Sequence, residues 1–225
     1  VGSLVGVSGT QLINNFALTV DSAATTTFAG VISGTGSLVK DGSGTLTLSG
    51  NSTYTGGTTV TGGKLIVSGS LNNTSSVTIA AGAELELSGT LTASGNIVNH
   101  GTLVLTGAPQ LGAGGTITNN GTIINRAPGY TLPANLVNNG ALYNLPAAPV
   151  GLTATAGNAQ VVLSWSAVAG SSGYLVKQSA FSGGPYTTIA TPTGTTHTVT
   201  GLTNGSIYYF VVSASNTAGE SANSA

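Results

Sequence analysis

The stretch Gly44-Thr45-Leu46-Thr47-Leu48 decides the fold, because variants of this short phrase return along the first two thirds of the chain. The other copies are Gly63-Lys64-Leu65-Ile66-Val67, Leu85-Glu86-Leu87, Gly101-Thr102-Leu103-Val104-Leu105, Gly121-Thr122-Ile123-Ile124 and Gly140-Ala141-Leu142-Tyr143. Their first apolar residues stand at 46, 65, 85, 103, 123 and 142, so successive copies are 19, 20, 18, 20 and 19 residues apart. A period near twenty, with alternation inside each copy, predicts a β-solenoid.

The composition favours an all-β chain. Charged residues make up 4% of the 225 residues, which leaves almost none of the Glu, Lys and Arg that cover the outer faces of helices. Thr and Val suit pleated strands, and the 35 glycines, together with many asparagines, suit tight corners.

Charge and cysteine usage exclude several partners and cofactors. The net charge is −1 and there is no basic patch, so a nucleic-acid partner lacks its main electrostatic attraction. The absence of cysteine excludes a disulfide framework and a thiolate metal site, and we expect no cofactor. No apolar run approaches the roughly 20 residues that span a bilayer, so we expect no direct membrane insertion. No secretion leader is visible at Val1, so any such signal has been removed or lies outside this chain.

The alternation predicts which side chains fill the solenoid. In each copy two apolar residues share one face of the strand, and stacking the coils places these pairs in continuous internal rows. The predicted core residues are Leu46, Leu48, Leu65, Val67, Leu85, Leu87, Leu103, Leu105, Ile123 and Leu142. Asn125 and Asn144 take the place of apolar residues in the last two coils, so we expect the core to become polar there.

Asparagine and glycine mark the corners between coils. Asn99, Asn119 and Asn138 each stand two residues before a glycine, and both residue types accept positive φ at low cost. The three asparagines could hydrogen-bond to one another as a ladder, or they could serve only as turn formers. The sequence leaves both alternatives open.

The run from Phe28 to Gly69 resembles the autotransporter-associated β-strand repeat of bacterial surface passengers. The resemblance is carried by glycines and apolar residues that agree in spacing and order: Phe28, Gly30, Ile32, Gly34, Gly36, Leu38, Lys40, Gly42, Gly44, Leu46, Leu48, Gly50, Tyr54, Thr55, Gly56, Val60, Gly63, Leu65 and Val67. It implies a right-handed parallel β-helix, over residues 1–145, on an exported bacterial protein at the cell surface.

A proline-rich linker is expected at residues 146–149, and the pattern changes after it. Residues 150–225 resemble an immunoglobulin-like fibronectin type III β-sandwich. The resemblance places Trp165 in the core of the sandwich, Tyr208 at the tyrosine-corner position and Phe210 on an inward-facing strand.

The last strand of that family is apparently missing before Ala225. An open sheet edge favours strand addition. The segment Val1-Gly2-Ser3-Leu4-Val5-Gly6-Val7 alternates suitably for that purpose, so Val1, Leu4, Val5 and Val7 form a candidate strand-exchange segment. This predicts a head-to-tail homopolymer, which the low surface charge would not oppose.

The titratable residues give no catalytic constellation. Glu84 and Glu86 lie two apart on one predicted strand, facing outward if their neighbours face in, and no His or Arg is near them in sequence. A solvated outer face explains them better than a carboxylate pair. His100 occupies an Asn position in a corner, and His197 alternates with threonines as a surface residue would. We therefore expect no enzyme.

Five asparagines head Asn-x-Ser/Thr triplets that could carry glycans on an exported protein: Asn51, Asn72, Asn73, Asn120 and Asn204. Together these features predict an extracellular structural or adhesive protein, a self-assembling filament subunit or surface stalk that contacts itself or extracellular polymers. The alternative is a carbohydrate- or host-binding segment of a larger autotransported protein or polysaccharide-degrading enzyme. An exposed row of aromatic residues would favour this alternative, and Tyr54, Tyr130 and Tyr143 are the candidates.

Overall fold

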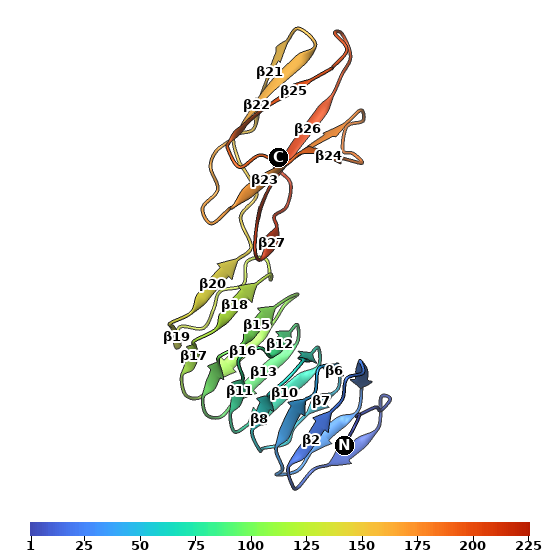
Figure 1. Cartoon of the computed structure of the whole chain (residues 1–225), viewed down its shortest axis with the longest axis vertical. Coiled ribbons are helices and arrows are strands. Elements are labelled where there is room, and N and C mark those ends of the chain that lie inside the picture. The colour runs from blue at the N-terminus through green and yellow to red at the C-terminus, as the bar shows by residue number, and fades with distance from the viewer. The chain divides into compact units, whose positions relative to one another are not determined.

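A computed structural model describes residues 1–72 and 74–225, and these residues form strands and no helix. They divide into two compact units, Val1–Leu142 and Tyr143–Ala225, whereas the sequence placed the domain boundary after residue 145. The first unit is a parallel β-solenoid of about seven turns, and the second is a β-sandwich (Figure 1).

Three stacks of parallel strands form the walls of the solenoid. Sheet 1 contains β3 (Thr26–Phe28), β6 (Thr45–Leu48), β9 (Lys64–Val67), β12 (Glu84–Leu87), β15 (Thr102–Leu105), β18 (Thr122–Asn125) and β20 (Ala141–Asn144). Sheet 2 contains β2 (Leu18–Asp21), β5 (Leu38–Asp41), β8 (Thr58–Val60), β11 (Val77–Ile79), β14 (Ile97–Asn99), β17 (Ile117–Asn119) and β19 (Leu136–Asn138). The third wall contains β1 (Gln11–Ile13) paired with β4 (Val31–Ser33), and the sheet β7 (Asn51–Ser52), β10 (Ser70–Thr74), β13 (Thr90–Ala93) and β16 (Gln110–Ala113).

Sheet 1 stacks the repeated phrase in register, and its inward residues form two aliphatic rows. One row runs through Leu46, Leu65, Leu85, Leu103 and Ile123, and the other through Leu48, Val67, Leu87 and Leu105 before it reaches Asn125. All of the aliphatic members are at most 1% exposed. Leu142, in the last coil, is half-buried and packs against the same core. The rows arise because coils of nearly equal length return the same strand face to the same place.

Asn99, Asn119 and Asn138 form the ladder at the inner corner of sheet 2. The Asn99 amide donates to Asn119 Oδ1 at 2.7 Å, and the Asn119 amide donates to Asn138 Oδ1 at 2.6 Å. The same amides also donate to the carbonyl oxygens of Thr122 and Ala141. Because Asn99 and Asn119 are at most 1% exposed, these bonds satisfy polar groups that have no access to water.

Side chains replace a further strand at the C-terminal edge of the third wall. The Tyr130 hydroxyl accepts the Leu111 N–H at 3.3 Å, and the Asn135 amide donates to the Ala113 carbonyl at 3.1 Å. These two bonds occupy backbone groups of β16 that a next coil would otherwise pair with.

The proposed strand-exchange segment lies against its own first turn. The Val1 ammonium donates to the Thr19 carbonyl at 2.6 Å, and Gly6 forms a parallel bridge with Phe28. Leu4 packs against the solenoid core, while Val5 and Val7 are exposed. The segment is therefore not a free strand, and donating it to another molecule would first require breaking these contacts.

The second unit is an antiparallel sandwich. One sheet contains β21 (Thr153–Gly157), β22 (Gln160–Ser164) and β25 (Thr196–Thr200), and the other contains β24 (Thr187–Ala190), β23 (Gly173–Ser179), β26 (Tyr209–Asn216) and β27 (Gly219–Glu220). Trp165 is 5% exposed in the core, with its ring edge-on to Tyr174 at a centroid distance of 5.4 Å. Phe210 is half-buried against this core.

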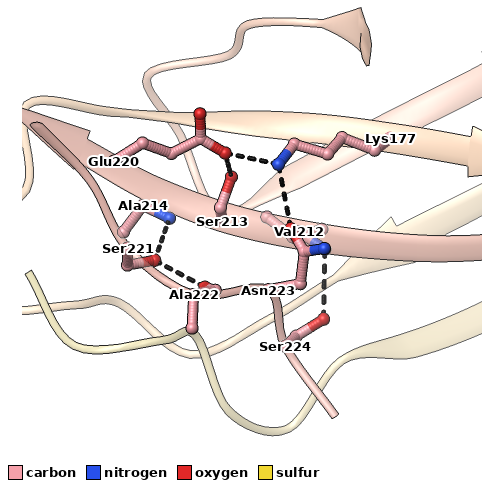
Figure 2. Close-up of polar contacts among 9 residues, drawn as sticks. All are labelled: Lys177, Val212, Ser213, Ala214, Glu220, Ser221, Ala222, Asn223 and Ser224. Atoms are coloured by element: carbon pink, nitrogen blue, oxygen red, sulfur yellow. Dashed lines mark hydrogen bonds and ion pairs between the residues drawn. The ribbon is translucent and has the colours of Figure 1, made fainter. Parts of the chain in front are cut away.

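Part of the sheet edge that was expected to be open is occupied by the residues that follow β26. β27 pairs with β26, and the chain continues beside β26 through two serines. The Ser221 and Ser224 N–H groups donate to the carbonyls of Ala214 and Val212. Their hydroxyls accept the N–H groups of the same two residues (Figure 2). In this segment the serine hydroxyl oxygens accept the N–H groups that backbone carbonyls accept in a regular ladder.

Candidate functional site

Lys64 joins the two acidic residues on the outer face of sheet 1. Its ammonium lies 2.8 Å from Glu84 Oε1 and 2.6 Å from Glu86 Oε2. Burial opposes the charge on Lys64, but the two carboxylates outweigh this effect and raise its pKa above the ordinary value. This partner was not predicted, because Lys64 is 20 residues from Glu84. That spacing is one coil and places the two residues in register. One ammonium holds both carboxylates and offsets one of their two charges, which is the arrangement of a surface ion-pair cluster.

Lys40 points into the solenoid and is 1% exposed. Its ammonium donates to the carbonyl oxygens of Asp41, Gly42 and Gly62 at 2.7, 3.0 and 3.0 Å. Burial lowers the pKa of Lys40, and the nearby carboxylates of Asp41 and Asp21 oppose that shift. All three ammonium protons bond to corner carbonyls, so this lysine holds a corner of the coil and has no proton free for a ligand.

Lys177 is the centre of a polar cluster on the sandwich (Figure 2). Its ammonium contacts Glu220 and donates to Asn223 Oδ1 at 2.9 Å, and the Ser213 hydroxyl donates to Glu220 Oε1 at 2.6 Å. The hydrogen bonds from Lys177 and Ser213 lower the pKa of Glu220. The carboxylate that accepts the Ser213 proton is paired with Lys177, which makes it a weaker base, so this cluster fastens the C-terminal segment to β26 and β23 and does not resemble an activated nucleophile.

Tyr208 makes the contact expected of a tyrosine corner. Its hydroxyl accepts the Thr203 N–H at 3.1 Å, and this bond lowers the pKa of Tyr208. The hydroxyl group therefore fixes the loop before β26, which is a structural role.

The candidate aromatic residues do not form a binding row. Tyr54 is 1% exposed and its hydroxyl bonds to Thr58 at 2.6 Å, so burial raises its pKa. Tyr130 caps β16, and Tyr143 is 38% exposed. The sequence did not show whether Tyr54 faces inward or outward, because the residues beside it are polar or small and mark no inner face.

The described glycan-acceptor asparagines differ in accessibility. Asn51, Asn120 and Asn204 are exposed, and Asn72 is half-buried. The Asn204 amide donates to Asn158, whereas its oxygen accepts the Ala159 N–H. Asn73 lies outside the described residues.

The two histidines belong to different units. His100 is exposed at a corner of the solenoid. His197 is half-buried on β25, opposite the core residue Leu163, and is therefore on the inner face of the sandwich edge and not on the outer surface expected from sequence. Across residues 1–72 and 74–225, no three His, Cys, Asp or Glu side chains gather where they could hold a metal ion.

The described residues of the sandwich line at least two hollows. One, of about 110 Å³, is lined by residues of the β21–β22 and β25–β26 connections, including Tyr208 and Asn204. The other, of about 320 Å³, is lined by Gln178, Ile189, His197, Thr198, Val199 and Thr200. Neither lining contains a carboxylate. In the part of the chain that the structure describes, no helix has the length and apolarity needed to cross a bilayer.

Comparisons with known proteins assign each unit separately. Residues 38–67 match the passenger-associated-transport-repeat family, and residues 147–225 match the fibronectin type III domain family. The chain thus contains an autotransporter-associated repeat and a fibronectin type III domain, as predicted from the sequence.

Individual relatives cover parts of the chain. An amylopullulanase from Thermoanaerobacterium saccharolyticum is 45% identical over 67 residues, which are 29% of this chain and 5% of the enzyme. This chain therefore spans a small fraction of that relative. The Fn3-like protein from Clostridium thermocellum is 47% identical over 36% of this chain and 88% of its own, with a TM-score of 0.34. The twitchin kinase region from C. elegans is 28% identical over 35% of this chain and 15% of its own, with a TM-score of 0.33.

The two family matches define the class of protein. Repeats and domains of these kinds are usually non-catalytic, and their combination is typical of a surface or passenger-type module of an exported protein.

Proposed function

We propose that this chain is a non-catalytic structural and adhesive module at a bacterial cell surface, with the solenoid as a stalk and the sandwich as a spacer. The observation that carries the proposal is the outer face of sheet 2. Its seven mid-strand outward positions, which pair in register, are all Thr or Val: Thr19, Val39, Thr59, Thr78, Val98, Thr118 and Val137. Such an uncharged, β-branched row suits contact with neutral polymers, whereas sheet 1 carries the Lys64 cluster.

An adhesion assay tests this function. Beads coated with the chain are expected to adhere to surfaces coated with neutral bacterial exopolysaccharide, without releasing reducing ends. Thr78→Lys places a charge in the row on sheet 2 and should weaken adhesion. Thr45→Lys is the matched control, because Thr45 is equally half-buried but lies on sheet 1 beside Lys64. Equal adhesion of the two variants, or release of reducing ends, would contradict the proposal.

A second candidate is a glycan-binding segment of a polysaccharide-degrading enzyme. The similarity to amylopullulanase favours it. Retardation of the chain in a pullulan-containing native gel would support this function, and unchanged mobility would argue against it. The burial of Tyr54 and the capping role of Tyr130 remove two of the three expected stacking residues.

Head-to-tail polymerisation stays a prediction. Electron microscopy of the purified chain checks it, since uniform fibres are the expected outcome for a polymer and separate particles are the outcome that excludes it.

A further inference from the structure

Strand β25 has an edge whose backbone groups face outward. It pairs with β22 on one side and ends the order β21–β22–β25. The Trp165 N–H donates to the Thr195 carbonyl, so these two residues form a hydrogen-bonded pair. In an antiparallel ladder, hydrogen-bonded pairs alternate with pairs that do not bond to each other. His197 and Val199 therefore bond to β22. The residues whose N–H and C=O groups point away from β22 are Thr196, Thr198 and Thr200.

This edge carries none of the features that usually prevent strand addition. Thr196–Thr200 contains no lysine, no proline and no bulge. Two other edges in the described residues are protected: β24 has an irregular register opposite Val176 and Lys177, and Tyr130 covers β16. The edge of β25 also borders the hollow of about 320 Å³, where Ile189 is 41% exposed.

The edge is complementary to itself. If two copies of β25 run antiparallel with Thr198 opposite Thr198, then Thr196 of one copy lies opposite Thr200 of the other. The outward backbone groups of the two strands then meet as three hydrogen-bonded pairs, which supply about six hydrogen bonds. On the inner face His197 lies opposite Val199, so no histidine faces its own copy. Registers centred on His197 or Val199 fail, because β22 already occupies their backbone groups.

We propose that β25 pairs with β25 of a second copy of this chain, so that two three-stranded sheets join into one continuous sheet. Threonine faces threonine across the outer side of this pairing, a combination that forms favourable cross-strand contacts. Each copy also covers the open hollow of the other and the Ile189 side chain within it. The pairing links two molecules side by side through their sandwiches, and it does not depend on the adhesive function proposed for the solenoid.

Cysteine cross-linking of the full chain tests the register. The chain contains no cysteine, so each introduced thiol reports alone. Thr198→Cys should form a disulfide-linked dimer on air oxidation, because hydrogen-bonded partners have Cα atoms about 5.5 Å apart, within disulfide range. An equimolar mixture of Thr196→Cys and Thr200→Cys should form mixed dimers in preference to dimers of either variant with itself. Thr155→Cys, on the opposite edge strand of the same sheet, is the control and should stay monomeric.

Sedimentation of the uncrosslinked chain gives an independent measurement. The unmodified chain should dimerise as its concentration rises, Thr198→Lys should remain monomeric because like charges would meet at the centre, and Thr155→Lys should behave as the unmodified chain. A chain that stays monomeric up to its solubility limit overturns the proposal. So does a Thr198→Lys variant that dimerises normally, or mixed cysteine dimers that form no faster than the Thr155→Cys control.

Discussion

At the scale of single residues, the buried hydroxyl of Tyr54 links two neighbouring coils. It bonds to the Thr58 hydroxyl, which lies 3.1 Å from the Thr74 hydroxyl. Tyr54→Phe should lower the free energy of unfolding by about 0.5–1.5 kcal/mol, because a buried hydroxyl loses its partner. Tyr143→Phe is the control, since Tyr143 is 38% exposed. Denaturant titration followed by circular dichroism measures both.

The same tyrosine predicts a response to alkaline pH. Burial raises the pKa of Tyr54 above the 10.0 of the unfolded chain, so above pH 10 the unfolded state loses its phenolic proton first. Stability from this group is complete below pH 10 and is lost as pH rises, by up to about 1.4 kcal/mol per pH unit. Tyr54→Phe should therefore show a shallower fall in stability between pH 9 and 11. Parallel curves for the two proteins would contradict the burial of this hydroxyl.

Asn119 is the central member of the asparagine ladder. Asn119→Ala removes the partners of Asn99, Asn138 and the Ala141 carbonyl together, and it should cost about 1–3 kcal/mol. Asn120→Ala changes the exposed neighbour and should stay within about 0.5 kcal/mol of the unmodified chain. Equal costs in a denaturant titration would show that Asn119 acts only as a turn former.

At the scale of elements, one corner of the solenoid is a column of glycines. A Cβ on Gly50, Gly69 or Gly89 would lie 1.9–2.2 Å from the carbonyl oxygen of the glycine one coil earlier. Gly69→Ala should therefore force the coils apart and cost about 1–3 kcal/mol or more. Gly112→Ala in β16 is the control, because its Cβ would meet the Thr92 methyl at an ordinary 3.6 Å. A melting temperature that falls equally in both variants would contradict this close approach.

The inward rows of sheet 1 predict a contrast between adjacent residues. Leu103 is 1% exposed between Leu85 and Ile123, so Leu103→Ala should cost about 2–5 kcal/mol. Thr102 is on the outer face, and Thr102→Ala should be nearly silent. Denaturant titration of the two variants checks which face each residue occupies. Similar losses of unfolding free energy in the two variants would contradict the assignment.

The repeat made the inward rows of the solenoid predictable from the sequence, and it left several side-chain contacts unpredicted. Leu46 and Leu65 could be placed in one row from the sequence, because a side chain is buried in the solenoid only if it faces inward and recurs at the constant period. Contacts between coils are harder to predict. The pairing of Lys64 with Glu84 can be predicted only if the 20-residue period is applied to charged residues as well as apolar ones. Lys40 shares the inward face of Leu38, but a charge on that face contradicts ordinary patterning, and only the three corner carbonyls explain it. The contact of Ser221 and Ser224 with β26 was not predicted, because it uses serine hydroxyls, which no periodicity marks.

At the scale of the whole molecule, each unit has its own hydrophobic core, and the single tryptophan lies in one of them. Trp165 fluorescence therefore reports unfolding of the sandwich, whereas circular dichroism reports both units. Domains with separate cores unfold as separate cooperative units, so Leu103→Ala should move the solenoid transition in circular dichroism and leave the fluorescence transition in place. Val176→Ala, at a fully buried position of the sandwich, is the matched control and should do the reverse. A fluorescence midpoint that shifts with Leu103→Ala would mean that the two units unfold as one cooperative unit, because a destabilised solenoid core would then also destabilise the sandwich.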